Sequence, residues 1–134
     1  MFISSDTIDY IPVSSVRISE VHNSSIAGLC CSPDGIMYML DAGRSLIYRI
    51  DLTNGDCNTI AEGKFENPVD ITFFGMFIIV LVTNGLILLT PMGLLLKKYD
   101  FAFRSSPKAV CICDDTILVT GQNADIFKFI IEIK

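Results

Sequence analysis

Short runs of β-branched and aromatic residues recur about every ten residues along the chain, separated by Gly, Asn, Asp or Pro. No stretch keeps the 3.6-residue spacing of apolar positions that an amphipathic helix requires. The clearest segment has an apolar run at 26–31, a Ser-Pro-Asp-Gly turn at 32–35 and a second apolar run at 36–40. Proline presets φ at the first turn position and glycine supplies a positive φ, so this segment predicts a β-hairpin. The chain is predicted to be all β.

A unit of four predicted strands recurs along the chain. The first unit has strands at 26–31, 36–40, 46–52 and 57–61, the second at 69–74, 77–82, 86–90 and 94–100, and the third at 108–113, 116–120 and 125–133. Ile26, Pro68 and Pro107 stand at matching positions, with spacings of 42 and 39 residues. A period of about 40 residues with four short strands is typical of a β-propeller blade. We therefore expect an all-β fold of about three four-stranded propeller-type blades.

The 134 residues suffice for one domain of ordinary size. We expect N-terminal strands in residues 1–21, a first blade at 22–64, a second at 65–101 and a third at 102–134. The third unit lacks a clear fourth strand. Propellers often close by lending an N-terminal strand to the last blade, and the strand pattern at 16–21 is the candidate for this closure strand.

Residues 31–51, CSPDGIMYMLDAGRSLIYRID, carry the most specific motif. The segment resembles an NHL repeat, which has a Pro-Asp-Gly turn, an aromatic-containing strand, Asp-x-Gly and a strand running into Ile-Asp. Residues 83–87 and 121–126 match more weakly. WD40 repeats are a close rival, but Ile50 stands where that family commonly has tryptophan. The NHL-like interpretation is preferred; it implies propeller blades and says nothing about catalysis.

The 26 residues from Ile71 to Leu96 contain no charged residue. This run exceeds the roughly 20 residues that a helix needs to span a bilayer, so a membrane-anchored protein with 71–96 as the spanning segment is one alternative. Turn signals at Asn84-Gly85 and at 91–93 argue against a helix. A middle blade packs between two others, so its strands should be apolar on both faces. We favour the middle-blade interpretation, in which the protein has no membrane partner.

The overall composition limits the classes of partner. Hydrophobic residues make up 51% of the chain, and the 15 acidic and 10 basic residues give a net charge of −5. Because there is no Lys/Arg run, nucleic-acid binding is disfavoured. The N-terminus has no basic segment followed by an apolar stretch, so it does not predict a secretory signal, and the expected location is cytoplasmic.

The five cysteines give no sign of a disulfide framework or a zinc site. Their number is odd and none has Cys-x-x-Cys spacing. Cys111 and Cys113 share one face of a predicted strand, but zinc needs further ligands and the only histidine is His22. We expect the cysteines to be reduced and buried in strands.

The sequence contains no recognisable catalytic motif. A glycine-rich phosphate loop, a nucleophile elbow and a metal-binding histidine pair are all absent, so no catalytic residue and no cofactor are predicted. Lactonase-like propeller hydrolases resemble NHL proteins in outline and hold a divalent metal with acidic and amide ligands. That resemblance makes a metal-dependent hydrolase an alternative, with Asp70 as the weak candidate ligand beside Asn67, Asn84 and Asn123.

Binding through loops is the preferred function. In propellers the loop leading into each blade and the loop between its second and third strands open on one face, and binding residues concentrate on such loops. The expected binding rim consists of His22, Asn23, Arg44, Lys64, Glu66, Asn67, Asn84, Arg104, Gln122 and Asn123. We expect a non-catalytic protein-interaction module or assembly subunit that binds a protein partner or itself.

Three blades are fewer than the roughly four to eight of closed propellers, so a homodimer forming a six-bladed ring is the expected assembly.

Overall fold

The computed structural model describes residues 11–12 and 24–132, and these residues form three antiparallel sheets. Blade 1 consists of β1 (Ile26–Cys31), β2 (Ile36–Asp41), β3 (Leu46–Asp51) and β4 (Cys57–Ile60). Blade 2 consists of β5 (Pro68–Phe74), β6 (Phe77–Val82), β7 (Gly85–Leu89) and β8 (Leu95–Asp100). Blade 3 consists of β9 (Pro107–Cys113), β10 (Thr116–Gly121) and β11 (Ile126–Ile130). In every blade, strands that follow one another in sequence pair with one another.

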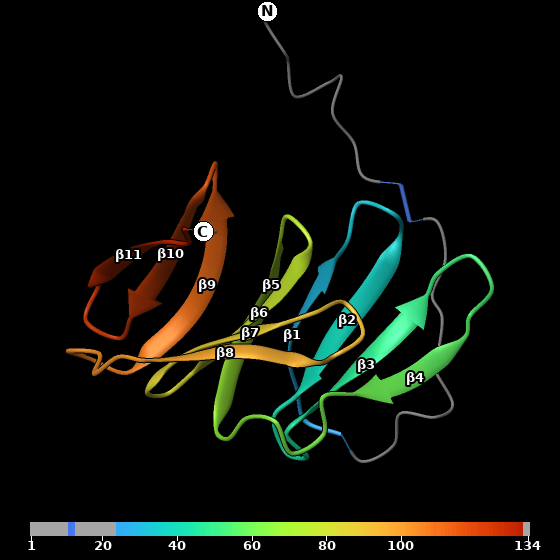
Figure 1. Cartoon of the computed structure of the whole chain (residues 1–134), viewed down its shortest axis with the longest axis horizontal. Helices are drawn as coiled ribbons and strands as arrows, with labels where there is room; N and C mark the ends of the chain where they lie inside the picture. The colour runs from blue at the N-terminus through green and yellow to red at the C-terminus, as the bar shows by residue number, and fades with distance from the viewer. Residues whose placement is uncertain (1–10, 13–23, 133–134) are drawn as a thin grey trace, which may run out of the picture.

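The three sheets stand side by side in chain order, with blade 2 between the other two (Figure 1). The first strand of each blade contacts the first strand of the next, since β1 packs on β5 and β5 packs on β9. We call β1, β5 and β9 the inner strands. The all-β prediction is confirmed, and so is the arrangement in propeller-type blades. Blade 3 has three strands in the described part of the chain, and the expected closure strand at 16–21 lies outside that part.

The hairpin between β1 and β2 has the predicted turn. Gly35 has a φ of 87°, a left-handed conformation that glycine adopts without the strain that a Cβ introduces. The N–H of Gly35 donates to the carbonyl of Ser32 at 3.1 Å, and the N–H of Ser32 donates to the carbonyl of Ile36 at 2.8 Å. The Pro-Asp-Gly sequence therefore fixes the register of this pair.

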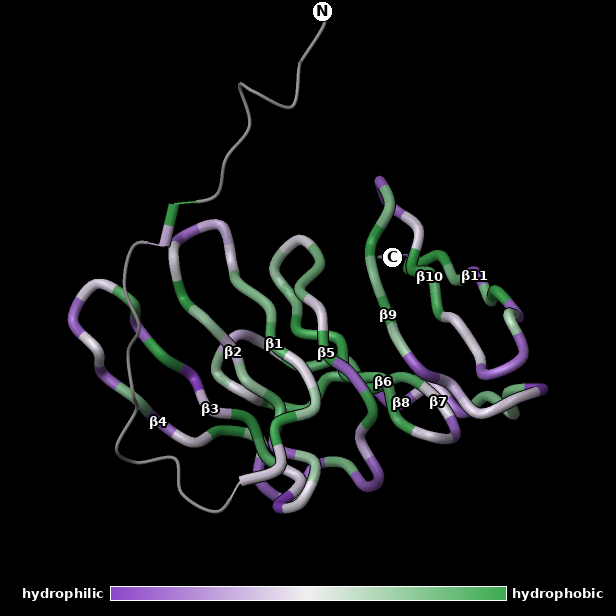
Figure 2. Tube along the Cα trace, turned by 180° about the vertical axis from the view of Figure 1, so that it is seen from behind, coloured by the Kyte–Doolittle hydropathy of each residue, from purple (hydrophilic) through white to green (hydrophobic). Residues whose placement is uncertain are grey.

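The apolar run at 71–96 forms most of blade 2. Side chains of β6 alternate between two cores: Ile78 and Val80 pack toward blade 1, while Ile79 and Leu81 pack toward blade 3. All four are at most 1% exposed, so this strand is apolar at consecutive positions because both of its faces are covered. Figure 2 shows the hydrophobic residues along the strands and the hydrophilic ones gathered at the turns. No helix in the described residues is long and apolar enough to cross a membrane.

The expectation that the cysteines are buried is wrong. Cys31, Cys111 and Cys113 are exposed, Cys30 and Cys57 are half-buried, and all five are free thiols. The three exposed cysteines lie on inner strands at the two ends of the row of blades, where no further described blade covers them. The strand assignment was sound, but burial on a strand depends on a neighbouring sheet.

Candidate binding rim

The inner strands of all three blades begin with the same irregularity. In β1 the register shift lies between Ile26 and Gly28, and in β5 it lies between Pro68 and Asp70. In β9 it lies between Pro107 and Ala109, which pair with Gly121 and Thr120 of β10. A bulge of this kind bends a strand and redirects its side chains. Because the shift recurs, Gly28, Asp70 and Ala109 occupy equivalent positions.

Two loops of each blade are joined at this end of the sheets. The N–H of the residue after the second strand donates to the carbonyl of the residue just before the inner strand. The pairs are Ala42 to Ser25 at 2.8 Å, Thr83 to Asn67 at 3.2 Å and Gln122 to Ser106 at 2.9 Å. The loop leading into each blade thus lies against the loop between its second and third strands, and together these loops form the rim.

In blade 1 the rim is fixed by a buried carboxylate. Asp41 is fully buried and accepts hydrogen bonds from the Tyr48 hydroxyl at 2.9 Å and from the N–H of Arg44 at 3.1 Å. Nη1 of Arg44 in turn donates to the Tyr48 hydroxyl at 3.4 Å. Burial, followed by the hydrogen bond to Asp41, raises the pKa of Tyr48. The aspartate of the Asp-x-Gly motif therefore holds the turn that carries Arg44.

One hollow of about 290 Å³ lies on the rim where blades 1 and 2 meet. Glu66, Asn67 and Asn84, all from the expected rim, line it together. Lys98 and Asp100 at the end of β8 also line it. This hollow carries charges of both signs and offers no preference for one sign of ligand.

A larger, open hollow of about 770 Å³ lies between blades 2 and 3. Arg104, Gln122 and Asn123 of the expected rim line it, together with Lys108. The remaining described lining residues are hydroxyl or apolar side chains, namely Thr83, Ser105, Ser106, Pro68, Val69, Phe103 and Pro107. No carboxylate is among the described lining residues, although the chain as a whole has a net charge of −5.

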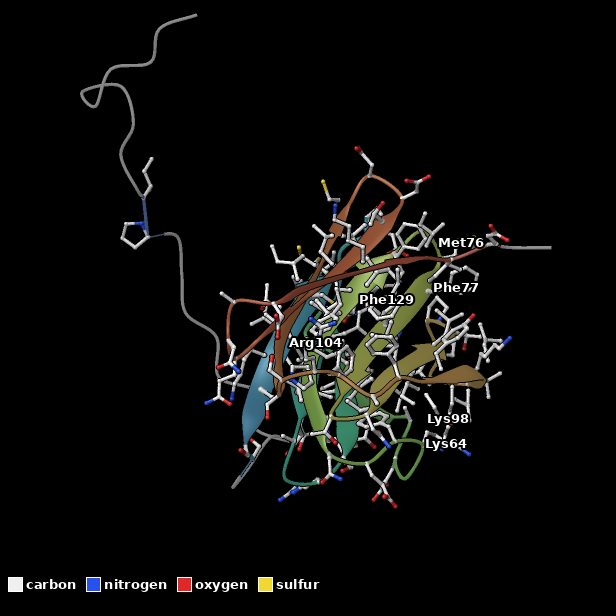
Figure 3. All side chains as sticks on the ribbon, turned by 90° about the vertical axis from the view of Figure 1, so that its left-hand side faces the viewer. Lys64, Met76, Phe77, Lys98, Arg104 and Phe129 are labelled. Carbon is white, nitrogen blue, oxygen red and sulfur yellow. The ribbon has the colours of Figure 1, made fainter. Side chains whose placement is uncertain are left out.

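The loop that carries Arg104 is tied to the adjacent turn of blade 3. The hydroxyl of Ser105 donates to Oδ2 of Asp125 at 2.9 Å. Arg104 itself is exposed, and Figure 3 shows it well apart from Lys64 and Lys98. The two cations of the larger hollow, Arg104 and Lys108, therefore project from anchored backbone.

The structure divides the expected rim into several groups. Arg44 and Lys64 are exposed but line neither hollow, and His22 and Asn23 lie outside the described residues. Sequence reasoning missed Lys98 and Lys108. Both lie within strands, where the face on which a side chain projects depends on the register, and the bulge before Ala109 changes that register.

Asp70, the weak candidate metal ligand, accepts two backbone hydrogen bonds. Its Oδ2 accepts the N–H of Val110 on β9 at 2.9 Å, and its Oδ1 accepts the N–H of Ile71 at 2.9 Å. The carboxylate thereby links the inner strands of blades 2 and 3. Among the described residues, no group of three or more His, Cys, Asp or Glu side chains is placed to hold a metal ion.

Comparison with known proteins identifies the fold and leaves the function open. The sequence matches no protein-family profile and no curated protein. Among solved structures, BamB from Moraxella catarrhalis aligns with a TM-score of 0.64 over 77% of this chain, at 10% identity. A chain of the nidogen–laminin complex aligns with a TM-score of 0.66 over 80%, at 18% identity. Virginiamycin B lyase from Staphylococcus aureus aligns with a TM-score of 0.59 over 83%, at 17% identity.

All three neighbours are β-propeller proteins. The fold is therefore that of propeller blades. The chain covers only 30%, 44% and 43% of these three structures, so it spans less than half of each. The neighbours include a lyase and a chain from a protein complex, so the likeness determines the blade architecture and not an activity.

Proposed function

We propose that this chain is a non-catalytic protein-interaction module whose rim, at the hollow between blades 2 and 3, binds an acidic segment of a partner protein. The observation that carries the proposal is the composition of that hollow. Arg104 and Lys108 line it, amide and hydroxyl groups surround them, and no described lining residue is acidic. A cationic concavity on an anionic chain concentrates its field at one place and attracts carboxylates there.

The hollow also has the shape and anchoring that a peptide site needs. Its volume of about 770 Å³ accommodates several side chains. The Gln122 backbone is bonded to Ser106, and Ser105 is bonded to Asp125, so both walls are fixed before a ligand arrives. Preformed walls lower the entropy lost on binding.

Within the propeller class, an NHL-like subtype is our preferred assignment. The motif of residues 31–51 supports this assignment. Asp41 of its Asp-x-Gly element accepts hydrogen bonds from the Arg44 N–H and the Tyr48 hydroxyl, and so caps the turn. A cytoplasmic location remains the expectation from the sequence.

A binding assay with a labelled hexaglutamate peptide tests the proposal. Arg104→Ala and Lys108→Ala should each weaken binding about fivefold, because one exposed ion pair contributes up to about 1 kcal/mol. Raising the salt concentration should weaken binding further. Fluorescence anisotropy measures both effects.

Lys64→Ala is the matched control. Lys64 is also an exposed cation on the expected rim but does not line this hollow, so its removal should change the affinity less than twofold. Equal losses in all three variants, or no binding of hexaglutamate by the unsubstituted protein, would reject the proposed site.

A further inference from the structure

Each blade has an outer strand whose far edge pairs with no described strand. These outer strands are β4, β8 and β11, and β11 is the last strand of the three-stranded blade 3 (red in Figure 1). Such an edge presents backbone N–H and C=O groups and can accept a further strand unless the protein blocks it. The three edges differ in how far they are blocked.

The edges of β4 and β8 carry features that hinder pairing. β4 has only four residues, and β8 has a register shift against β7 and two adjacent lysines, Lys97 and Lys98. Short edge strands, irregular pairing and lysines are common protections against a further strand. The five residues of β11 pair with β10 without a shift, and Lys128 is the single lysine among them. The edge of β11 is therefore the most open of the three.

The register shows which backbone groups of β11 face its outer side. The N–H of Gly121 donates to the carbonyl of Asp125 at 2.9 Å, and the pairing of β10 with β11 continues unbroken from there. Hydrogen-bonded and non-hydrogen-bonded pairs alternate along an antiparallel ladder. The N–H and C=O groups of Ile126, Lys128 and Ile130 therefore point away from β10, toward the outer side.

An apolar cavity lies beside this edge. We call the contact between blades 1 and 2 the first junction and the contact between blades 2 and 3 the second. The cavity, of about 200 Å³, lies at the second junction, with Leu88 of β7, Tyr99 of β8 and Phe129 of β11 in its walls. Asp100 is the single charged residue among its described lining residues. Because an apolar cavity of about 150 Å³ holds a benzene molecule, this one has room for a large apolar side chain.

A strand added to β11 would direct side chains into this cavity. Phe129 packs in the core between blades 2 and 3, whereas Lys128 is exposed on the opposite face of the sheet. In an antiparallel pair, residues directly opposite each other have their side chains on the same face. A residue opposite Phe129 therefore points to the cavity side, and its neighbour opposite Lys128 points to the open side.

We propose that the outer edge of β11 binds an extended segment of a partner protein as the fourth strand of blade 3. The segment occupies the place that β4 and β8 take in blades 1 and 2. It runs antiparallel to β11, with a large apolar side chain in the cavity opposite Phe129 and an acidic side chain opposite Lys128. In this mode of recognition, backbone hydrogen bonds provide affinity and the side-chain contacts provide specificity. The cavity shares no lining residue with the rim hollow between blades 2 and 3, so this proposal is independent of the acidic-peptide site.

A labelled peptide of sequence Thr-Leu-Glu-Val-Thr has the required alternation, and fluorescence anisotropy measures its binding. In the proposed register its leucine lies opposite Phe129 and its glutamate opposite Lys128. Replacing the leucine by alanine should weaken binding about tenfold, because most of the apolar surface that enters the cavity is lost. No binding of the parent peptide, or equal binding of the two peptides, would overturn the proposal.

Methylation of single peptide nitrogens separates strand addition from simple apolar contact. The N–H of the glutamate faces β11, so its methylation removes a hydrogen bond and should weaken binding about tenfold. The N–H of the leucine faces away from β11, so its methylation gives a control of identical mass that should bind within twofold of the parent peptide. Equal affinities of the two methylated peptides would rule out pairing in this register.

Lys128→Glu tests the charged contact from the protein side. Lys128 is exposed, so the chain should stay folded, and binding of the peptide should weaken about fivefold. A peptide with lysine in place of glutamate should bind this variant better than the unsubstituted chain, a result that loss of folding cannot produce. Lys64→Glu is the matched control, since Lys64 is exposed in the loop between β4 and β5 and does not line the cavity. The proposal fails if both variants lose the same affinity or if the lysine peptide shows no preference.

Discussion

Blades 2 and 3 have the same strand pairing at equivalent positions and very different surroundings. Leu81 and Thr120 each pair with the residue that follows the bulge of the inner strand, yet Leu81 is fully buried and Thr120 is exposed. Leu86 and Ile126 differ in the same way, at 4% and 65% exposed. Burial in this molecule is therefore determined by the neighbouring sheet and not by the strand itself.

The composition of the two blades follows this difference. Every residue of β7 is buried, and the sequence there is wholly apolar apart from its first glycine. Along β11, exposed and half-buried residues alternate, and Lys128 stands on the exposed face. A strand between two sheets must be apolar on both faces, whereas a strand with one covered face needs apolar residues only at every second position.

The largest expected effect comes from a charge at the covered position of blade 2. Leu81→Asp should abolish folding, because a carboxylate in this core costs several kcal/mol without a partner and total stability is only about 5–15 kcal/mol. Thr120→Asp at the equivalent position of blade 3 should leave the chain folded. Circular dichroism and solubility report both outcomes; a folded Leu81→Asp protein would contradict the buried assignment of blade 2.

The next effect concerns the link between the two blades. Asp70→Ala removes the acceptor of the Val110 N–H and should destabilise the protein by about 2 kcal/mol, the usual worth of a hydrogen bond to a charged group. Asp115→Ala, at an exposed site in the β9–β10 turn, should change stability by less than about 0.5 kcal/mol. Urea unfolding measures both, and equal midpoints for the two variants would remove the structural role of Asp70.

A smaller effect is expected at the equivalent position of blade 1. A Cβ at Gly28 would collide with Oδ1 of Asp70, so Gly28→Ala should cost about 1 kcal/mol as that carboxylate shifts away from its donors. Blade 3 already carries a Cβ there, in Ala109. In an Asp70→Ala background the cost of Gly28→Ala should shrink, which a double-mutant cycle detects. Additive costs would show that the two residues do not interact.

The smallest effect is a pH dependence of stability from Cys30 at the first junction. Burial raises the pKa of its thiol to about 12, with further contributions from Cys31 and Asp70. The unfolded chain loses this proton near its ordinary value of 9.0, so stability is unaffected below pH 9 and falls as the pH rises from 9 toward 12. Cys30→Ala should make that fall shallower than it is in the unsubstituted protein. Urea midpoints at pH 7 and pH 10 provide the test, and the same fall in the variant and the unsubstituted protein would refute it.

The rim illustrates what sequence reasoning captured only in part. Turn residues such as Asn67 and Asn84 are visible in the sequence, because Asn-Gly and Asn-Pro are local signals of chain reversal. Lys98 and Lys108 were missed because they lie within strands, where the direction of a side chain depends on register and on the bulge. The grouping of Arg104 with Lys108 in one hollow required the packing of blade 3 on blade 2.

The sequence by itself determined the strands, the turns and the repeat of about 40 residues, because these depend on local alternation and on the φ preferences of Gly, Pro and Asn. Tertiary structure decided which faces are covered. Cys30 is half-buried against blade 2, whereas Cys111, at the equivalent position of blade 3, is exposed. The two cysteines have the same local setting on an inner strand, so nothing near them in the chain distinguishes them. The difference arises because hydrophobic burial depends on the sheet that lies opposite, which is remote in sequence.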